Sequence, residues 1–403
     1  MASEWKTYSV QELIDAGMLE EPMDGNHGGI HPKASDYVLS GVPFIMANDL
    51  INGKVDYKNC AFITERQAAT LKKGFSHPGD VLLTHKATIG RTAIVSDEYE
   101  TIILTPQVTY YRVKNGISNR YLKYYFDFST FQKTFSNWAG SGSTRAYLGI
   151  TAQRKLPIIL PPYETQLKIA KCCGILDKKI YVNEQINDNL QQQADLIFQQ
   201  EFLRRGDLPE GWSIGCLLDI ANYLNGLAMQ RFRPDEGETG LPVLKIKELR
   251  QGFCDASSEL CSPNIKAEYV VHDGDVIFSW SGSLLVDFWC GGICGLNQHL
   301  FKVTSDQYPK WFYYAWTVHH LARFVAIAAD KATTMGHIKR EELAKAEVVI
   351  PDSASMERIG ELLQPVYDLI ISNRIENRKL ASLRDVLLPK LMSGEIDVST
   401  MQI

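Results

Sequence analysis

Two stretches of this 403-residue sequence repeat apolar residues in sevens, and the second stretch follows the first at a constant offset of 190 residues. A heptad repeat of this kind is typical of long helices that pack against another helix. The rows of the first stretch are Ile169, Leu176, Asn183, Leu190 and Ile197, with Cys173, Ile180, Asn187 and Ala194. The rows of the second are Ile359, Val366, Asn373, Leu380 and Leu387, with Leu363, Ile370, Asn377 and Arg384. Each stretch predicts a helix of roughly 40 residues, which would be about 60 Å long.

Two Asn residues interrupt each heptad seam, and they do so at the same places in both copies. Asn at a seam position weakens a coiled coil but fixes its register and its choice of partner. Two unrelated amphipathic helices are the alternative, but these would not place their polar interruptions in register. We therefore predict that the two helices pack as an antiparallel coiled coil in which the two Asn pairs meet.

The duplication extends beyond the helices. Four pairs of segments match at offsets that fall from 207 to 190: those beginning at Trp5 and Trp212, at Gly41 and Gly240, at Pro78 and Asp273, and at Ser143 and Thr333. The fall in offset is expected if the first copy has longer loops. The predicted division is a first module at 1–160, a long helix at 161–206, a second module at 207–351, and a second long helix with a tail at 352–403.

Inside each module the pattern indicates a mixed α/β fold. Short β-branched runs separated by turns predict strands at 44–46, 81–83, 101–104 and 108–113. Aromatic-rich stretches predict helices at 119–138 and 308–329, and further strands at 156–160 and 347–350 precede the long helices. The predicted fold class is thus α+β, a tandem duplication of one mixed module followed by one long helix.

Composition narrows the class of protein. The formal net charge of −5 argues against a simple basic nucleic-acid binder, so any DNA contact must come from local patches or from partners. The sequence has no run of about 18 apolar residues, so we expect no membrane partner. The eight Cys residues are scattered, which favours a reduced, cytoplasmic protein.

Motifs for catalysis and metal binding are incomplete. The run Pro161-Pro162-Tyr163 is similar to the Asn/Asp-Pro-Pro-Tyr loop of amino-methyltransferases, but Leu160 stands where the amide or carboxylate would hold the target amine. The glycine-rich run 140–144 lacks the lysine of a phosphate-binding loop. Cys290, Cys294 and His299 fit no common zinc spacing. We therefore expect no catalytic residues, no metal site and no cofactor bound by this chain.

Polar loops with isolated cations and aromatics remain, and side chains of these types can contact base edges and phosphates. An ordinary solvated loop stays an alternative for any single residue among them. The candidate DNA contacts are, in the first module, Asn26, His27, Lys33, Lys86, Thr88, Arg91, Arg145 and Tyr147, and in the second, Arg231, Ser281, Ser283, Lys331, Thr333 and His337.

Taken together, these features resemble the DNA-specificity subunit of type I restriction–modification systems. The signatures are GVPFIMANDLINGKVD from Gly41, PGDVLLTHKATIGRTAIV from Pro78, LPIILPPYETQLKIAKCCGILDKKIYVNEQI from Leu156, and LLPKLMSGEIDV from Leu387. The most specific piece is Pro-Pro-x-Glu-x-Gln at 161–166. The second copy departs from it at 351–356, although the heptads that follow are kept.

The resemblance implies that each module is a target-recognition domain for one half of a split double-stranded DNA site, with the helices setting the spacer. Two modification subunits would dock on this chain, bind S-adenosylmethionine and methylate adenine. Whether restriction subunits join them stays open. A coiled-coil adaptor that binds proteins without reading DNA is a second interpretation, and a self-contained modifying enzyme is a third. Salt-dependent binding to duplex DNA separates the first from the second.

Overall fold

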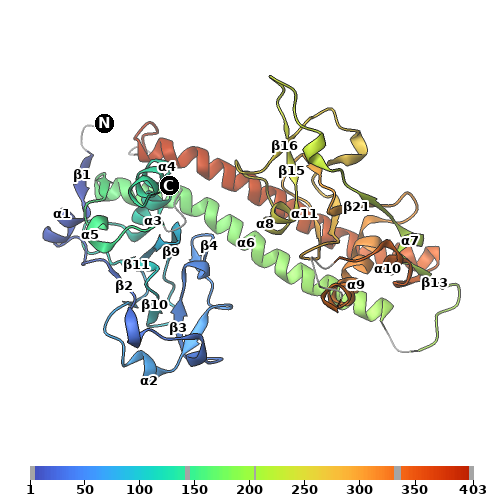
Figure 1. Cartoon of the computed structure of the whole chain (residues 1–403), viewed down its shortest axis with the longest axis horizontal. Helices are drawn as coiled ribbons and strands as arrows, with labels where there is room; N and C mark the ends of the chain where they lie inside the picture. Colours follow the sequence, from blue (N-terminus) through green and yellow to red (C-terminus); the bar gives the residue numbers. More distant parts are fainter. Residues whose placement is uncertain (1–4, 141–145, 204–205, 331–336, 399–403) are drawn as a thin grey trace. The chain divides into compact units, whose positions relative to one another are not determined.

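The computed structural model describes residues 5–140, 146–203, 206–330 and 337–398. The chain divides into two compact units, which we call unit 1 (residues 1–177 and 382–403) and unit 2 (residues 178–381). Figure 1 traces the chain through both. Among the described helices, none combines the length and the apolar character needed to span a membrane.

Unit 1 contains one mixed sheet, one antiparallel sheet and a short pair of strands that joins the start of the chain to the segment before the first long helix. The strands are β1 (Lys6–Ser9), β2 (Met23–Asp24), β3 (Val42–Ile45), β4 (Leu50–Ile51), β5 (Lys54–Val55), β6 (Ala61–Ile63), β7 (Phe75–Ser76), β8 (Val81–Lys86), β9 (Thr88–Ile94), β10 (Ile102–Leu104), β11 (Val108–Tyr111) and β12 (Pro157–Leu160). One sheet has the order β6-β3-β10-β7 and the other β2-β11-β8-β9, while β4 pairs with β5. Strand β1 pairs with β12, so the segment before the first long helix is tied to the start of the chain.

Unit 2 repeats this topology. Its strands are β13 (Ser213–Cys216), β14 (Asn222–Asn225), β15 (Leu241–Leu244), β16 (Leu260–Cys261), β17 (Val270–Val271), β18 (Val276–Ser279), β19 (Leu285–Phe288), β20 (Cys294–Leu296), β21 (Leu300–Thr304) and β22 (Glu347–Ile350). The sheet orders are β16-β15-β20-β17 and β14-β21-β18-β19, and β13 pairs with β22. In both units the central pair, β3 with β10 or β15 with β20, is parallel. The predicted tandem duplication of a mixed α/β module is confirmed.

One difference between the helices of the two units lies at Phe128. The short ones are α1 (Val10–Asp15), α2 (Glu65–Ala68), α5 (Ile150–Gln153), α7 (Leu217–Ile220), α8 (Ile246–Gln251) and α10 (Arg340–Ala344). In unit 2, α9 (Lys310–Asp330) is continuous, whereas unit 1 has α3 (Asn119–Asp127) and α4 (Ser129–Trp138). Phe128 separates them because its ψ of 130° is extended and turns its side chain into the core. The prediction of one helix over 119–138 was therefore wrong at Phe128.

Helix α6 (Tyr163–Phe202) begins directly after two prolines. Proline suits the start of a helix because it lacks a backbone N–H, and the N–H groups there have no acceptor within the helix. The side chain of Gln166 is buried and fixes this start. Its Oε1 accepts from Ser118 N at 3.0 Å, and its Nε2 donates to the carbonyl oxygens of Gly116 at 3.1 Å and Pro161 at 3.0 Å. These bonds explain why Gln closes the Pro-Pro-x-Glu-x-Gln motif.

Helix α11 (Ser353–Met392) begins differently, in line with its divergent sequence. Asp352 accepts from Ser355 N at 2.7 Å, as an N-cap residue does. The Ser355 hydroxyl in turn lies 3.3 Å from Trp212 Nε1, which donates to it. An N-cap from the residue just before the helix thus replaces the glutamine bonds of the first copy.

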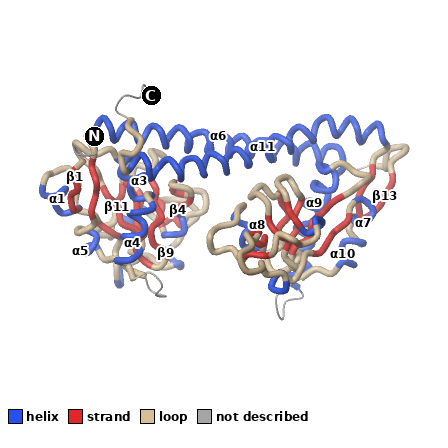
Figure 2. Tube along the Cα trace, turned by 90° about the horizontal axis from the view of Figure 1, so that it is seen from above, coloured by secondary structure: helices blue, strands red, loops and turns tan. Residues whose placement is uncertain are grey.

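The two long helices pack along their predicted seam within each unit, and all the seam residues are buried or half-buried. In unit 2, Asn183 Nδ2 donates to Asn377 Oδ1 at 2.8 Å, and Asn373 Nδ2 donates to Asn187 Oδ1 at 2.9 Å. Pairing of 183 with 377 and of 187 with 373 makes this packing antiparallel, as predicted. Figure 2 shows the two helices lying side by side.

Each unit has its own apolar core. In unit 1 the last turns of α11 and the tail enter the core, where Leu388, Met392 and Val398 pack with Val10 and Leu13. In unit 2 the core is rich in aromatic side chains from α9. The core of unit 1 is therefore completed by the end of the chain.

Candidate nucleic-acid interface

In unit 1, the hairpin of β8 and β9 meets the segment that follows residue 145. Lys86 and Tyr147 form an antiparallel bridge. Ala87 N donates to Ala146 O at 3.0 Å, and Leu148 N donates to the carbonyl oxygen of His85 at 3.0 Å. The stretches that carry the candidate residues Lys86 and Tyr147 are thereby joined through their backbones.

The side chains of this junction combine cations with an aromatic ring. Lys86 Nζ lies 6.0 Å from the centre of the Tyr147 ring, and half of the Tyr147 surface is exposed. Thr88 lies opposite Lys86 across the hairpin. Arg91 is exposed, and its Nη1 donates to Ala47 O at 3.4 Å. These four predicted residues therefore lie on one hairpin or on the segment that pairs with it.

The third predicted loop begins at Asp24, whose side chain is buried. Asp24 Oδ2 lies 3.0 Å from His27 Nε2, and Asp24 Oδ1 accepts from Lys73 Nζ. Asn26 is also buried, and its amide bonds the backbone of Lys72 and Lys73, with Lys72 N donating at 3.0 Å. Asn26 therefore supports the loop from inside, whereas His27 is exposed to solvent.

His85 lies fully buried beneath this junction. Its Nδ1 is 3.0 Å from Leu148 O, and because a carbonyl oxygen can only accept, Nδ1 carries the proton. Its Nε2 lies 3.9 Å from Asp24 Oδ2 and has no hydrogen-bond partner among the described residues. Burial lowers the pKa of His85, and the neighbouring Asp24 carboxylate only partly opposes this. A neutral His85 thus faces a carboxylate without donating to it.

Unit 2 repeats the backbone junction at the same offsets as the sequence. Ser281 and His337 form an antiparallel bridge, 195 and 190 residues after Lys86 and Tyr147. Ile338 N donates to Trp280 O at 3.1 Å, as Leu148 does to His85. The corresponding loops of the two units are thus joined in the same way, although their side chains differ.

A second equivalence involves the buried Asp24 and His85 of unit 1. In unit 2, Trp280 Nε1 donates to Asn225 Oδ1 at 2.9 Å, where unit 1 places His85 against Asp24. One unit therefore carries a neutral amide and an indole at this junction, and the other carries a carboxylate and an imidazole.

The other predicted residues of unit 2 vary in exposure. Ser281 is buried, and its hydroxyl lies 3.1 Å from His299 Nδ1. Ser283, Arg231 and His337 are exposed. In unit 1, Lys33 is exposed and its backbone N donates to Asp36 Oδ2 at 2.7 Å. Arg145, Lys331 and Thr333 lie outside the described residues.

Several residues that hold these loops together were not predicted from the sequence. They are Asp24, Lys73, His85, Trp280 and His299. The shared offset of 195 between His85 and Trp280 was a signal that could have pointed to one of them. Lys73 carried no such signal, because it lies outside every matched segment.

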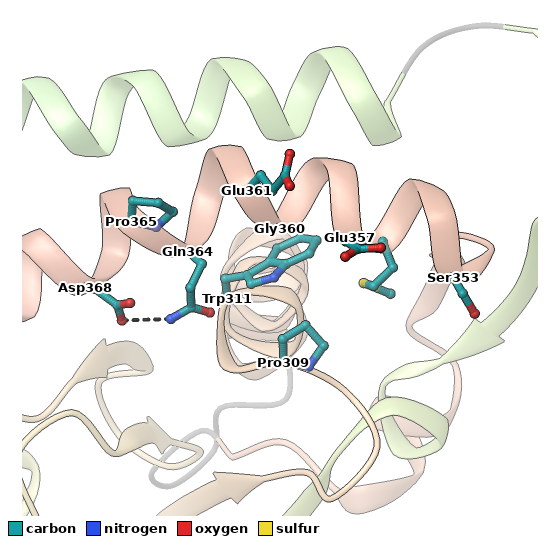
Figure 3. A pocket seen from close by; sticks show the side chains of 10 residues that line it. Pro309, Trp311, Ser353, Glu357, Gly360, Glu361, Gln364, Pro365 and Asp368 are labelled. Atoms are coloured by element: carbon teal, nitrogen blue, oxygen red, sulfur yellow. Dashed lines mark hydrogen bonds between the residues drawn. The ribbon is translucent and has the colours of Figure 1, made fainter.

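A groove on the surface of unit 2 is formed by the first turns of α11 and the start of α9 (Figure 3). Its volume is about 710 Å³, and Trp311 forms part of its floor beside Gly360. The ten lining residues are Pro309, Trp311, Ser353, Met356, Glu357, Gly360, Glu361, Gln364, Pro365 and Asp368. Three carboxylates and no Lys or Arg therefore border this part of the described surface.

The described residues contain no group of three or more His, Cys, Asp or Glu side chains arranged to hold a metal ion. Cys290 and Cys294 are buried, and burial raises the pKa of both thiols, that of Cys290 to about 11. Cys290 Sγ donates to the carbonyl oxygen of Ile371 at 4.0 Å, within unit 2.

Comparison with known proteins gives consistent results. A family model described as the type I restriction modification DNA specificity domain matches residues 2–192 and 209–383. The MjaIX specificity subunit of Methanocaldococcus jannaschii is 26% identical, with 98% of this chain and 95% of that protein covered. The HindI specificity subunit of Haemophilus influenzae is 18% identical, with 98% and 100% covered. The crystal structure of a type I S subunit from M. genitalium has a similar fold, with a TM-score of 0.56 at 12% identity over 96% of both chains.

Proposed function

Because the chain belongs to the DNA specificity subunits of type I restriction–modification systems, which are themselves non-catalytic, we propose that its two modules read the two halves of one bipartite DNA site. The proposed reading modules are residues 1–160 and 207–351. The observation that carries the proposal is the repeated loop junction, Lys86 with Tyr147 and Ser281 with His337. The same backbone frame holds different side chains in the two copies, as two different half-sites require.

The exposed side chains suggest how the two modules differ. In unit 1, Lys86, Arg91 and Lys33 are cations that can bond phosphates or the acceptor edge of guanine. In unit 2, Ser283 and His337 offer a hydroxyl and an imidazole, and Arg231 adds a guanidinium elsewhere on the module. Arg145, Lys331 and Thr333 stay in the proposed contact set on sequence grounds. Asn26 and Ser281 are proposed as supports, since both are buried.

The choice of partner subunits follows from the methyl-transfer chemistry that a non-catalytic chain lacks. A complex that methylates DNA needs a methyl donor, which we assign to two modification subunits that bind S-adenosylmethionine and dock on the long helices. The acidic groove of α11 supports this assignment, because Glu357, Glu361 and Asp368 surround an apolar floor that contains Trp311 (Figure 3). Charge complementarity favours a basic amphipathic segment of the modification subunit as its occupant.

Sequencing of methylated DNA tests the proposal. The chain, produced with its modification subunit, should methylate a split site, and the variants Lys86→Gln and Arg91→Gln should alter only one half of it. A lost base contact should cost about 1–3 kcal/mol and relax one position, whereas a lost phosphate contact should weaken binding to all sequences alike. Ser283→Ala should affect only the other half.

Lys58→Gln is the matched control, because Lys58 is an exposed cation in unit 1 outside the junction. If the complex bound duplex DNA with no dependence on salt, or if all three junction variants kept the site and its affinity, the modules would not be DNA readers. The adaptor interpretation would then be preferred.

A further inference from the structure

Asp24 joins three segments of unit 1 that lie far apart in the sequence. Asp24 is 3% exposed, yet its carboxylate contacts Lys73 from a distant loop and His27 from its own loop, with His85 on the buried side. A buried carboxylate is stable only when it is paired, so Lys73 and His27 are held where the carboxylate fixes them. Neither Asp24 nor Lys73 is among the residues to which the sequence pattern assigned a contact.

The two partners reach from this buried anchor to the surface. The side chain of Lys73 is 34% exposed and that of His27 is 52% exposed. An ammonium group has three N–H donors, and Asp24 takes one of those of Lys73. Asn26 fixes the same segment, because its side chain bonds the backbone of Lys72 and Lys73. Lys73 is thus held both by its charge and by its backbone.

We propose that Asp24 is a positioning residue that holds Lys73 and His27 against a phosphate of the DNA backbone beside the half-site read by unit 1. This inference rests on the proposed function and adds the ligand group and the residues that bind it. A phosphate suits this site, since the Lys73 ammonium keeps further N–H donors and lies with the His27 imidazole on one anchor. Asp24 acts only through its partners and does not itself contact DNA.

The arrangement belongs to one module. At the equivalent place in unit 2, the neutral Asn225 accepts from Trp280 and no carboxylate is present to hold a cation. The phosphate contact is therefore expected at the first half-site only. A duplex in which the second half-site is scrambled should keep it.

The test measures DNA affinity of the complex with its modification subunit as a function of salt. The probe is a duplex that carries the site found by sequencing methylated DNA. Each phosphate contact contributes about 0.9 to the slope of log affinity against log salt. Asp24→Asn should reduce this slope by about 1, and Lys73→Gln should do the same. The double variant should fall no further than Asp24→Asn, because Asp24 acts only through Lys73 and His27.

Asp97→Asn is the control, since it removes an exposed carboxylate of unit 1 and should leave the slope unchanged. If Asp24→Asn lowered only the unfolding temperature and kept the wild-type slope, Asp24 would be a purely structural residue and the inference would fail. Lys73→Gln, at a partly exposed position, decides the matter if Asp24→Asn does not fold. A wild-type complex that does not bind the duplex at all would instead overturn the proposed function.

Discussion

At the scale of single residues, the tips of the two equivalent hairpins share a backbone conformation that only one of them accommodates easily. Ala87 has a φ of 64°, and Gly282, 195 residues later, has a φ of 65°. A left-handed residue costs little for glycine, but the Cβ of alanine makes it unfavourable by roughly 1 kcal/mol. Unit 1 therefore keeps a strained residue between Lys86 and Thr88, at the junction proposed to face DNA.

The strain predicts opposite effects for exchanged residues. Ala87→Gly should stabilise unit 1 by up to about 1 kcal/mol, and Gly282→Ala should destabilise unit 2 by about as much. A Cβ at Gly282 would meet Ile246 Cδ1 at 3.7 Å, which is ordinary contact, so the cost should come from the backbone alone. Urea unfolding of both variants measures the two changes. Shifts in the same direction for both variants would show that φ is not the cause.

At the scale of elements, the seam between α6 and α11 contains a symmetric group of four Asn side chains. Besides the bonds between amides, Asn187 Nδ2 donates to Ile370 O and Asn377 Nδ2 donates to Ile180 O, both at 3.3 Å. Each of these hydrogen bonds donated by an Asn of α6 has a counterpart donated by the Asn 190 residues later in α11. Because a slipped register would leave these buried amides unpaired, the group selects one alignment of the helices.

A charged cluster in unit 1 occupies the place of an aromatic cluster in unit 2. Asp177 accepts from Arg384 Nη1 at 2.7 Å and from Tyr124 Oη at 2.5 Å. The residues 190 positions after Asp177 and Tyr124 are Tyr367 and Tyr314, whose rings meet edge to face at 5.1 Å. The two long helices therefore pack with charged side chains in unit 1 and with aromatic rings at the equivalent place in unit 2.

The charged cluster predicts a pH dependence that belongs to unit 1. Burial alone would raise the pKa of Asp177. The charge of Lys123 and the hydrogen bonds from Tyr124 and Arg384 lower the pKa by more than burial raises it, so the net pKa lies below its ordinary value. A lowered carboxyl pKa stabilises the fold above the unfolded pKa of about 3.9, and this stability is lost as the pH falls through the folded pKa. Asp177→Asn should cost about 1–3 kcal/mol at pH 7 and progressively less toward pH 3.

Urea unfolding at a series of pH values measures this difference, and Tyr367→Phe is the matched control at the equivalent position. The control should show the same stability difference from wild type at every pH. A constant difference between wild type and Asp177→Asn from pH 6 to pH 3 would contradict the proposed role of the charge.

The sequence predicted the elements whose signals are periodic. The heptad rows, the paired Asn residues and the duplicated strands all follow from residues that recur at fixed intervals. The break at Phe128 could not be predicted, because it depends on how one side chain enters the core. The partners of Asp24 are equally hidden, since Lys73 and His85 lie 49 and 61 positions further along the chain and no repeat connects them.

At the scale of the whole molecule, the chain passes between the two units only inside helices α6 and α11. The unit boundaries fall between residues 177 and 178 and between 381 and 382, within the two 40-residue helices. We therefore predict that a change in the length of both helices changes the distance between the two units. If the units read two half-sites, the length of the helices should set the spacer between them.

Insertion of three heptads into both helices tests this dependence, directly after Ile180 in α6 and after Lys379 in α11. Whole heptads keep the seam in phase, and 21 residues add about 31 Å. One turn of DNA is about 34–36 Å, so both modules should still face the same side of the duplex. The methylated site should keep its two halves and gain a spacer longer by about nine base pairs.

Two further insertions separate length from register. A single heptad in both helices adds about 10 Å, or about three base pairs, and so turns the second half-site by about a third of a turn away from its module. Methylation by that variant should be weak. With three heptads in α6 alone, the Asn183–Asn377 and Asp177–Arg384 pairs can no longer both be in register, so the helix pair should be destabilised. Sequencing of methylated DNA measures all three outcomes, and an unchanged spacer with full activity in the double insertion would show that the helices do not set the distance.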